Sequence, residues 1–134
     1  MFSQRKRKAI PKKVRQAVYD MYGGRCAYCG EPLQYKDMQV DHVSSVMYHN
    51  GSDDIGNLLP ACRLCNFYKS TDTIEQFRAN LAEIPRRLAE HKQHRVIYNL
   101  ARKHGMVVET GAKIEFFFET HGKAGSSKGG RDSV

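Results

Sequence analysis

The sequence contains no apolar run that approaches the length of a membrane span. A transmembrane helix needs about 18 or more consecutive apolar residues, and no stretch of the 134 residues comes close. The basic residues at the start are not followed by the apolar segment of a secretory signal peptide. We therefore expect a cytoplasmic chain that does not contact membranes and whose cysteines stay reduced, which excludes a disulfide framework.

Acidic residues are scarce relative to basic ones. There are 14 Asp and Glu against 22 Lys and Arg, which gives a net charge of +8. An excess of this size indicates a polyanionic partner such as DNA, with mere solubility as the alternative. The excess is clustered, because residues 1–15 carry seven cations and no acid and residues 86–103 form a second basic stretch. The cations that we expect to contact nucleic acid are Arg5, Lys6, Arg7, Lys8, Arg86 and Arg87.

The four cysteines form two Cys-x-x-Cys pairs, Cys26 with Cys29 and Cys62 with Cys65. Two intervening residues let both sulfurs of a pair bind one tetrahedral ion, so two pairs fit a Cys₄ zinc site. A redox pair is the alternative, but the presence of two pairs and the lack of a βαβ pattern argue against it. Zinc bound by four thiolates has no open position for a substrate. We therefore predict a structural zinc ion.

Side chains that bind metals or transfer protons lie between and beside the cysteines: Asp41, His42, Asn57 and Asn66. Phosphodiester hydrolysis needs an activated water and a cation that stabilises the developing charge. Imidazole is a suitable base at neutral pH, and carboxylate and amide oxygens suit Mg²⁺. Singly, a histidine is more often a surface residue, and an asparagine after Cys65 can simply cap a helix. Together, in this order, the four residues indicate a hydrolytic metal site.

The residue pattern predicts a small α+β fold. We expect a helix from Pro11 to the glycines at 23–24, short strands at 38–43 and 57–61, and a helix that opens at Cys62 and runs to Lys69. Between the strands, residues 44–56 are polar and form a long loop.

The C-terminal half is expected to extend this fold. Asp72 and Glu75 have capping-box spacing before a helix whose apolar face includes Phe77 and Leu81. A second, basic helix is expected from Pro85 to His104. Strands at 106–110 and 112–119 would then form a β-hairpin whose phenylalanines pack against the basic helix, with stacking on bases as the alternative.

These elements predict one domain with flexible ends. The expected organisation is a basic flexible arm at 1–9, a single domain at 10–120 and a disordered tail at 121–134. Within the domain, residues 25–70 would form the core that carries the motifs, and residues 71–120 a helical and hairpin extension.

The ordered motifs resemble those of the zinc-containing HNH endonucleases, whose fold is called ββα-metal. The residues that carry the resemblance are Cys26-x-x-Cys29, Asp41-His42, Asn57, Cys62-x-x-Cys65-Asn66 and Lys69. They span about a third of the chain. The segment from Thr73 to Leu81 is also similar to small stand-alone phage-type members, which implies a bacterial or phage-infected host cell.

The resemblance implies a one-metal mechanism. His42 would be the general base that activates water, and Asp41 and Asn66 would bind Mg²⁺ or Mn²⁺. Asn57 would hold the loop and orient His42, and Lys69 would contact a phosphate. Cleavage at the 3′ oxygen would leave 5′-phosphate ends.

The loop after Asp-His departs from the family pattern. Family members often have a proline and a Gly-Gly pair there, whereas this loop has no proline and only Gly51 near the expected place. The roles of His49, Asp53 and Asp54 therefore stay open. Two other functions compete with cleavage: a zinc-stabilised module that binds DNA or RNA, and an accessory protein that docks onto phage packaging or recombination proteins. DNA specificity, nicking against double-strand cleavage, and oligomeric state also stay open.

Overall fold

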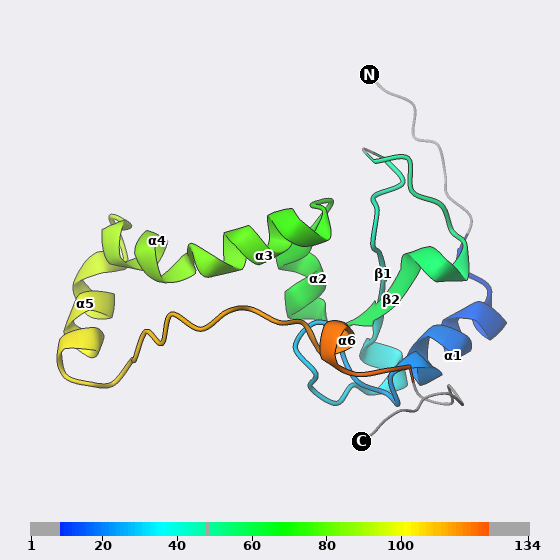
Figure 1. Ribbon diagram of the computed structural model, residues 1–134, viewed down its shortest axis with the longest axis horizontal. Coiled ribbons are helices and arrows are strands. Elements are labelled where there is room, and N and C mark those ends of the chain that lie inside the picture. Colours follow the sequence, from blue (N-terminus) through cyan, green and yellow to red (C-terminus); the bar gives the residue numbers. More distant parts are fainter. Residues whose placement is uncertain (1–8, 48, 124–134) are drawn as a thin grey trace.

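The chain folds into a body that contains a small sheet and a helical extension that projects from it (Figure 1). The computed structural model describes residues 9–47 and 49–123. Apart from residue 9 and residues 121–123, the predicted basic arm and disordered tail lie outside the described residues. Arg5, Lys6, Arg7 and Lys8 lie outside them as well.

The sheet and the helix after it form the predicted ββα unit. Strand β1 (Gln39–His42) pairs antiparallel with β2 (Leu58–Ala61), with Val40 opposite Pro60. A short 3₁₀ turn precedes each strand, at Tyr35–Asp37 and at Ile55–Asn57. All four residues of β2 are buried, so this strand forms the inner part of the body. Helix α2 (Arg63–Lys69) follows directly, with Cys62 as its N-cap.

Helix α1 (Lys12–Met21) covers the sheet and confirms the prediction for the first helix. It begins after Pro11, buries Val18 and Met21, and ends at two glycines with φ of +65° and +78°, a conformation that glycine adopts without strain. Arg15 donates from Nη2 to the carbonyls of Tyr35, at 2.7 Å, and Met38, at 3.0 Å. These bonds attach α1 to the chain that enters β1.

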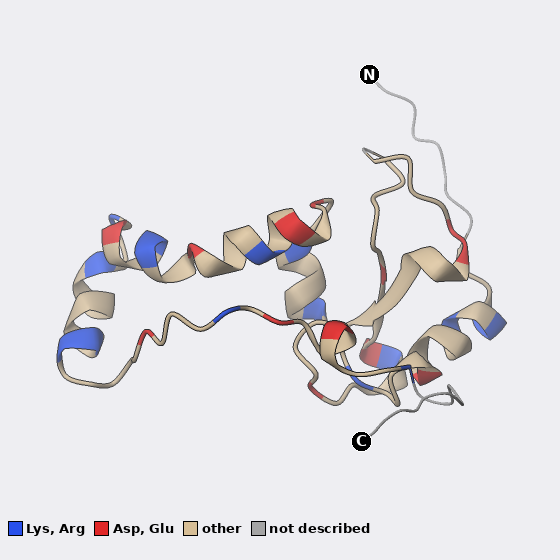
Figure 2. Ribbon diagram, viewed as in Figure 1, with Lys and Arg blue, Asp and Glu red and all other residues tan. Residues whose placement is uncertain are grey.

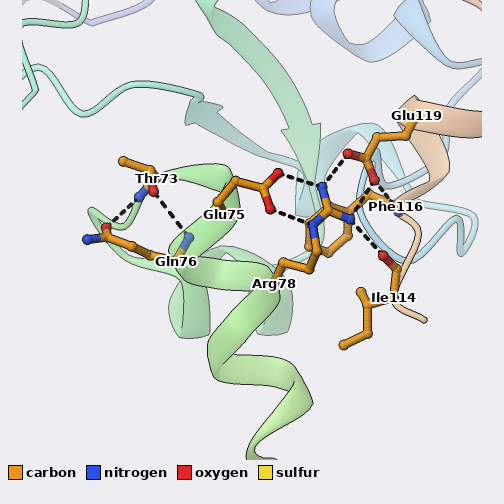
Figure 3. A network of polar contacts seen from close by, with 7 residues as sticks. All are labelled: Thr73, Glu75, Gln76, Arg78, Ile114, Phe116 and Glu119. Atoms are coloured by element: carbon orange, nitrogen blue, oxygen red, sulfur yellow. Dashed lines mark hydrogen bonds and ion pairs between the residues drawn. The ribbon is translucent and has the colours of Figure 1, made fainter. Parts of the chain in front are cut away.

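Helix α3 (Ile74–Ala82) begins one residue later than predicted. Thr73, rather than Asp72, is the N-cap: its Oγ1 accepts from the Gln76 N–H at 3.1 Å, and Gln76 Oε1 accepts from the Thr73 N–H at 2.9 Å (Figure 3). Glutamine at the third helical position satisfies a capping box as well as glutamate does. Glu75 is then available to bind Arg78.

The predicted helix from Pro85 to His104 is wrong, because two helices occupy this stretch. Helix α4 (Ile84–Glu90) ends at an extended His91, and α5 (Arg95–Lys103) turns away from it (Figure 1). Residues 91–94 contain no apolar side chain, so a helix continued through them would bury nothing. The two helices contact each other, and Asn99 Nδ2 donates to the Ala89 carbonyl at 3.1 Å. None of the helices in residues 9–47 and 49–123 is long and apolar enough to cross a membrane.

The predicted C-terminal β-hairpin is also wrong. Within the described residues the sheet has two strands, and residues 106–116 instead return from α5 to the body as an irregular extended segment (Figure 1). The chain then forms the short helix α6 (Phe117–Thr120). Met106 and Val108 stay exposed, so the apolar residues of the first predicted strand do not form a buried face.

The returning segment is held to the body by aromatic packing. Phe116 is 2% exposed, stacks on Phe77 of α3 with 5.0 Å between ring centroids, and meets the edge of Tyr28 at 5.3 Å. The Phe118 N–H donates to the Ala27 carbonyl at 2.8 Å. Phe116 is therefore a core residue, as predicted. Its partners are α3 and the loop of the first cysteine pair, not the basic helix.

Arg78 clamps α3 to the returning segment (Figure 3). Its guanidinium donates to the Ile114 carbonyl at 2.7 Å, forms ion pairs with Glu75 and Glu119, and lies over the Phe116 ring, 5.0 Å from its centroid. The hydrogen bond from Arg78 lowers the pKa of Glu119. The contact between Arg78 and Glu119 joins residues that are 41 positions apart in the chain.

Candidate metal centre and hydrolytic site

The four cysteines converge as predicted. Their sulfurs lie within 4.8 Å of one another, and Cys29 Sγ is 4.0 Å from Cys62 Sγ. Gly30 has φ of +80°, so the turn after the first pair uses the conformational freedom of glycine. The second pair stands at the start of α2, where the Cys65 N–H donates to Cys62 Sγ at 3.4 Å. The sulfur cluster thereby joins the loop of the first pair to the end of β2 and the start of α2.

The chemistry of this cluster fits a structural metal ion. The hydrogen bond from Cys65 lowers the pKa of Cys26 to about 4, whereas burial raises the pKa of Cys29 to about 11. The N–H groups of Tyr28 and Cys29 also point at Cys26 Sγ, at 3.4 and 3.5 Å. Four sulfurs this close repel one another as thiolates unless a cation lies between them. A divalent ion would remove this repulsion and bind all four.

Asp41 is buried in β1, with one carboxylate oxygen engaged. It is 5% exposed, and its Oδ2 accepts a hydrogen bond from Tyr28 Oη at 2.5 Å and lies 3.1 Å from Lys69 Nζ. Neither contact uses Oδ1. No buried side-chain oxygen in the described residues lacks a partner, so Oδ1 reaches the surface. Burial raises the pKa of Asp41, although the Tyr28 hydrogen bond and the Lys69 charge act in the opposite direction.

The predicted phosphate contact of Lys69 is wrong. Its side chain is 0% exposed, and Nζ donates to the His42 carbonyl at 3.0 Å in addition to pairing with Asp41. A side chain with no exposed surface cannot reach a phosphate. Lys69 instead holds α2 against the end of β1, which fixes the two residues of the Asp-His pair.

His42 lies at the end of β1 with its ring partly exposed. Neighbouring residues on a strand point to opposite faces, and Asp41 is accordingly buried while the His42 side chain is 22% exposed. His42 Nε2 lies 2.7 Å from Asp53 Oδ1. The other ring nitrogen, Nδ1, has no hydrogen-bond partner among the described residues. The sequence pattern left the role of Asp53 open, and only the fold brings it to His42.

Asn57 holds both ends of the loop between the strands. Its Oδ1 accepts from the Ser44 N–H at 2.8 Å, and its Nδ2 donates to the carbonyls of Ser44, at 3.0 Å, and Ser52, at 2.8 Å. Its own carbonyl accepts from the Val43 N–H at 2.8 Å. Within the described residues, Asn57 contacts the chain next to His42 rather than the imidazole itself.

Gly51 explains how this loop folds with a single glycine in the expected place. A Cβ at this position would lie 1.8 Å from the Ser44 carbonyl oxygen and 2.9 Å from Asn57 Nδ2. The Gly51 N–H donates to the Ser45 carbonyl at 3.0 Å, and so does the His49 N–H, at 2.9 Å. The loop therefore folds back so closely on its own start that no side chain fits at residue 51.

Asn66 lies on the side of α2 that faces the site. It is half-buried and precedes Lys69 by three residues, so the two side chains project from the same side of the helix. Lys69 reaches Asp41 from this side of α2. Asn66 lies one turn nearer the N-terminal end of the helix, where the second cysteine pair stands. Its carboxamide makes no hydrogen bond to the described residues.

The basic stretch of the helical extension carries less free charge than its sequence indicates. Arg86 pairs with Glu83 at 2.6 Å and with Glu90 at 3.1 Å. Arg87 donates to Tyr68 Oη at 3.1 Å and to Asn80 Oδ1 at 3.3 Å. Figure 2 shows acidic and basic residues interspersed along α3 and α4, whereas the charged residues of α5 are all basic.

Part of the chain matches a family model and segments of known proteins. Residues 26–72 match the family model for HNH endonucleases. The "SPbeta prophage-derived putative HNH endonuclease YoqL" of Bacillus subtilis (strain 168) is 29% identical over 73 residues, or 46% of this chain. The CRISPR-associated endonuclease Cas9 of Actinomyces naeslundii is 33% identical over 57 residues, or 42% of this chain.

These matches cover limited parts of the other proteins. The aligned segments are 30% of YoqL and 5% of the Cas9 chain. The crystal structure of the Type II-C Cas9 enzyme from Actinomyces naeslundii aligns with a TM-score of 0.47 and 28% identity, over 51% of this chain and 8% of that one. The segment matched by the family model contains both cysteine pairs, Asp41, His42, Asn57 and Asn66.

Proposed function

Because residues 26–72 carry an HNH endonuclease domain, we propose that this chain is a metal-dependent endonuclease that hydrolyses DNA phosphodiester bonds. The observation that supports this proposal most strongly is the state of three side chains around the end of β1. Asp41 has one carboxylate oxygen, Oδ1, that Tyr28 and Lys69 do not engage. His42 has one ring nitrogen, Nδ1, without a hydrogen-bond partner in the described residues. Asn66 lies on the same side of α2 as Lys69, which pairs with Asp41.

We assign His42 as the general base. Its Nδ1 would remove a proton from the attacking water while the ring is held through Nε2. Asn57 would keep His42 in place indirectly, by fixing the backbone of Ser44 and Val43. Attack at phosphorus with departure of the 3′ oxygen would leave 5′-phosphate ends.

We assign Asp41 and Asn66 as ligands of the catalytic Mg²⁺ or Mn²⁺. A carboxylate and an amide oxygen suit these hard cations, which bind few protein ligands and keep several waters. The bound ion would supply positive charge for the transition state and for the leaving 3′ oxygen. Lys69 would orient Asp41 by engaging Oδ2, which leaves Oδ1 for the ion.

We propose zinc as the ion of the sulfur cluster, with a structural role. A set of four cysteine sulfurs is a usual ligand set of structural zinc and leaves no position for substrate. For DNA contacts we retain Arg5, Lys6, Arg7, Lys8, Arg86 and Arg87 as candidates. Arg86 is the weakest of these, because two glutamates neutralise it.

A plasmid-nicking assay tests the proposal. The full chain should convert supercoiled plasmid to open circles or linear DNA with Mg²⁺ or Mn²⁺ and not without added divalent ions, and DNA ligase should reseal the nicks. His42→Ala should lower the rate by about 10²- to 10⁴-fold, the usual contribution of a general base. His104→Ala, at an exposed histidine of the extension, is the matched control and should cut at the wild-type rate.

Two measurements make a negative result informative. His42→Ala should retain the zinc content and DNA affinity of the wild type, since in this proposal His42 neither coordinates zinc nor contributes to DNA binding. If the wild type cuts in no divalent metal, or if His42→Ala cuts as fast as the wild type, the catalytic assignment is wrong.

A further inference from the structure

We propose that Asp53 is a positioning residue for the general base. Its carboxylate accepts a hydrogen bond from the His42 Nε2–H and thereby keeps Nδ1 free of its proton and directed at the attacking water. The inference rests on the proposed function, in which His42 activates water. Asp53 itself contacts neither the water nor the DNA in this proposal.

The geometry of the pair selects one tautomer of His42. The distance of 2.7 Å between Nε2 and Oδ1 is typical of a hydrogen bond to a charged acceptor. A neutral imidazole has one nitrogen that donates and one that accepts, whereas a carboxylate only accepts. Nε2 must therefore hold the proton, and Nδ1 must be the basic nitrogen.

The loop fixes Asp53 on both sides. The Ser52 carbonyl accepts from Asn57 Nδ2 at 2.8 Å, and the Asp54 carbonyl accepts from the Asn57 N–H at 2.7 Å. The Asp54 N–H donates to Ser52 Oγ at 3.2 Å. The backbone that carries Asp53 is thus held by residues on either side of it. An acid that orients a base from a fixed backbone follows the logic of catalytic triads.

The pair is better suited to orientation than to stability. The side chain of Asp53 is 49% exposed, and exposed ion pairs contribute little to folding. Loss of the carboxylate should therefore leave the fold intact and affect the rate of the chemical step. Asp54 offers a matched control, because it is exposed and its carboxylate makes no hydrogen bond or ion pair with the described residues.

Kinetics of the full chain on plasmid DNA test this role. Asp53→Ala should lower kcat by about 10- to 100-fold, the range expected when a reacting group is misplaced, with KM and the melting temperature unchanged. Asp54→Ala should match the wild type in all three. A fall in melting temperature that accompanies the loss of kcat, or a change in KM alone, would assign Asp53 a merely structural or DNA-binding role and overturn the proposal.

Nitrogen-15 NMR of the histidine rings tests the pairing without any cleavage. The His42 signal is assigned as the one that is missing from the spectrum of His42→Ala. At about pH 8.5, where histidine is normally neutral, this signal should show the Nε2–H tautomer in the wild type. In Asp53→Ala it should show a mixture of the Nε2–H and Nδ1–H tautomers. An Nδ1–H tautomer in the wild type overturns the inference. If the wild type cuts DNA and Asp53→Ala cuts it equally fast, this inference is wrong and the proposed function stands. If the wild type cuts no DNA, both the inference and the proposed function are wrong.

Discussion

Replacement of Lys69 by methionine should destabilise the whole domain. Methionine has a similar length and leaves no large cavity, so the change mainly removes the charge. Lys69 donates to the His42 carbonyl and pairs with Asp41 at 3.1 Å, and both charged groups are buried. Without Lys69, the Asp41 carboxylate would be an uncompensated charge inside the protein.

The structure allows the size of this effect to be bounded. Removal of one partner of a buried ion pair costs about 3–5 kcal/mol. Tyr28 continues to donate to Asp41, and burial already raises the pKa of Asp41, so this group can take up a proton instead. We therefore expect a loss of about 3 kcal/mol, the lower end of that range. This is a large share of the roughly 5–15 kcal/mol that stabilises a typical domain.

Urea unfolding at pH 7, followed by circular dichroism, measures this loss. The proposed zinc ion must be saturating in every sample, because metal binding contributes directly to the free energy of unfolding. Lys36→Met is the matched control, since Lys36 is exposed and its side chain makes no hydrogen bond or ion pair with the described residues. Asp41→Asn combined with Lys69→Met removes both charges and should be less destabilised than the sum of the single variants by about 1 kcal/mol or more.

Two results would refute the reasoning. If Lys69→Met lost less than about 1 kcal/mol, in the range of ordinary surface substitutions, the ion pair would not hold α2 to β1. If the double variant lost the full sum of the single losses, Lys69 and Asp41 would act independently and the pairing would be wrong.

Three further predictions concern the loop, the sulfur cluster and the clamp on the C-terminal segment. Gly51→Ala should abolish cleavage while zinc stays bound, because its Cβ would collide with the Ser44 carbonyl; an active variant in the nicking assay would contradict the close approach. Chelation of zinc should unfold the domain, as seen by circular dichroism, and a chain that stays folded without metal would disprove the structural role. Arg78 lowers the pKa of Glu119 from its ordinary value of 4.5, so this pair stabilises the docked segment above about pH 4.5 and loses that contribution as the pH falls through the lowered pKa. Amide protection of Phe118 should follow this pH dependence in the wild type and lose it in Arg78→Met.

The comparison of sequence and structure separates local from long-range information. The cysteine spacing predicted the sulfur cluster, and the strands and helix around it were placed correctly. Both follow from residues a few positions apart, where backbone geometry limits the arrangements. The same local reasoning placed the cap of α3 one residue early, because Glu75 and Gln76 are equally suitable partners.

The long-range contacts were not readable from local patterns. Lys69 and His42 are 27 residues apart, and nothing in the sequence distinguishes a lysine that contacts phosphate from one that is buried against a carboxylate. Strands were predicted at 106–110 and 112–119, but this segment is buried at Phe116, which packs against α3 and Tyr28 and not against a second strand. Tertiary packing overrides strand propensity in such cases.

The spacing of the cysteines and the short periodic segments predicted the candidate metal-binding side chains and the ββα order, because both are local properties of the chain. The contacts between distant residues follow from the folded structure alone. The fold placed Lys69 on Asp41, Asp53 on His42 and Gly51 against Ser44. Each of these contacts depends on how distant parts of the chain pack together. This packing is driven by the burial of apolar surface over the whole domain, which is not a property of any short segment.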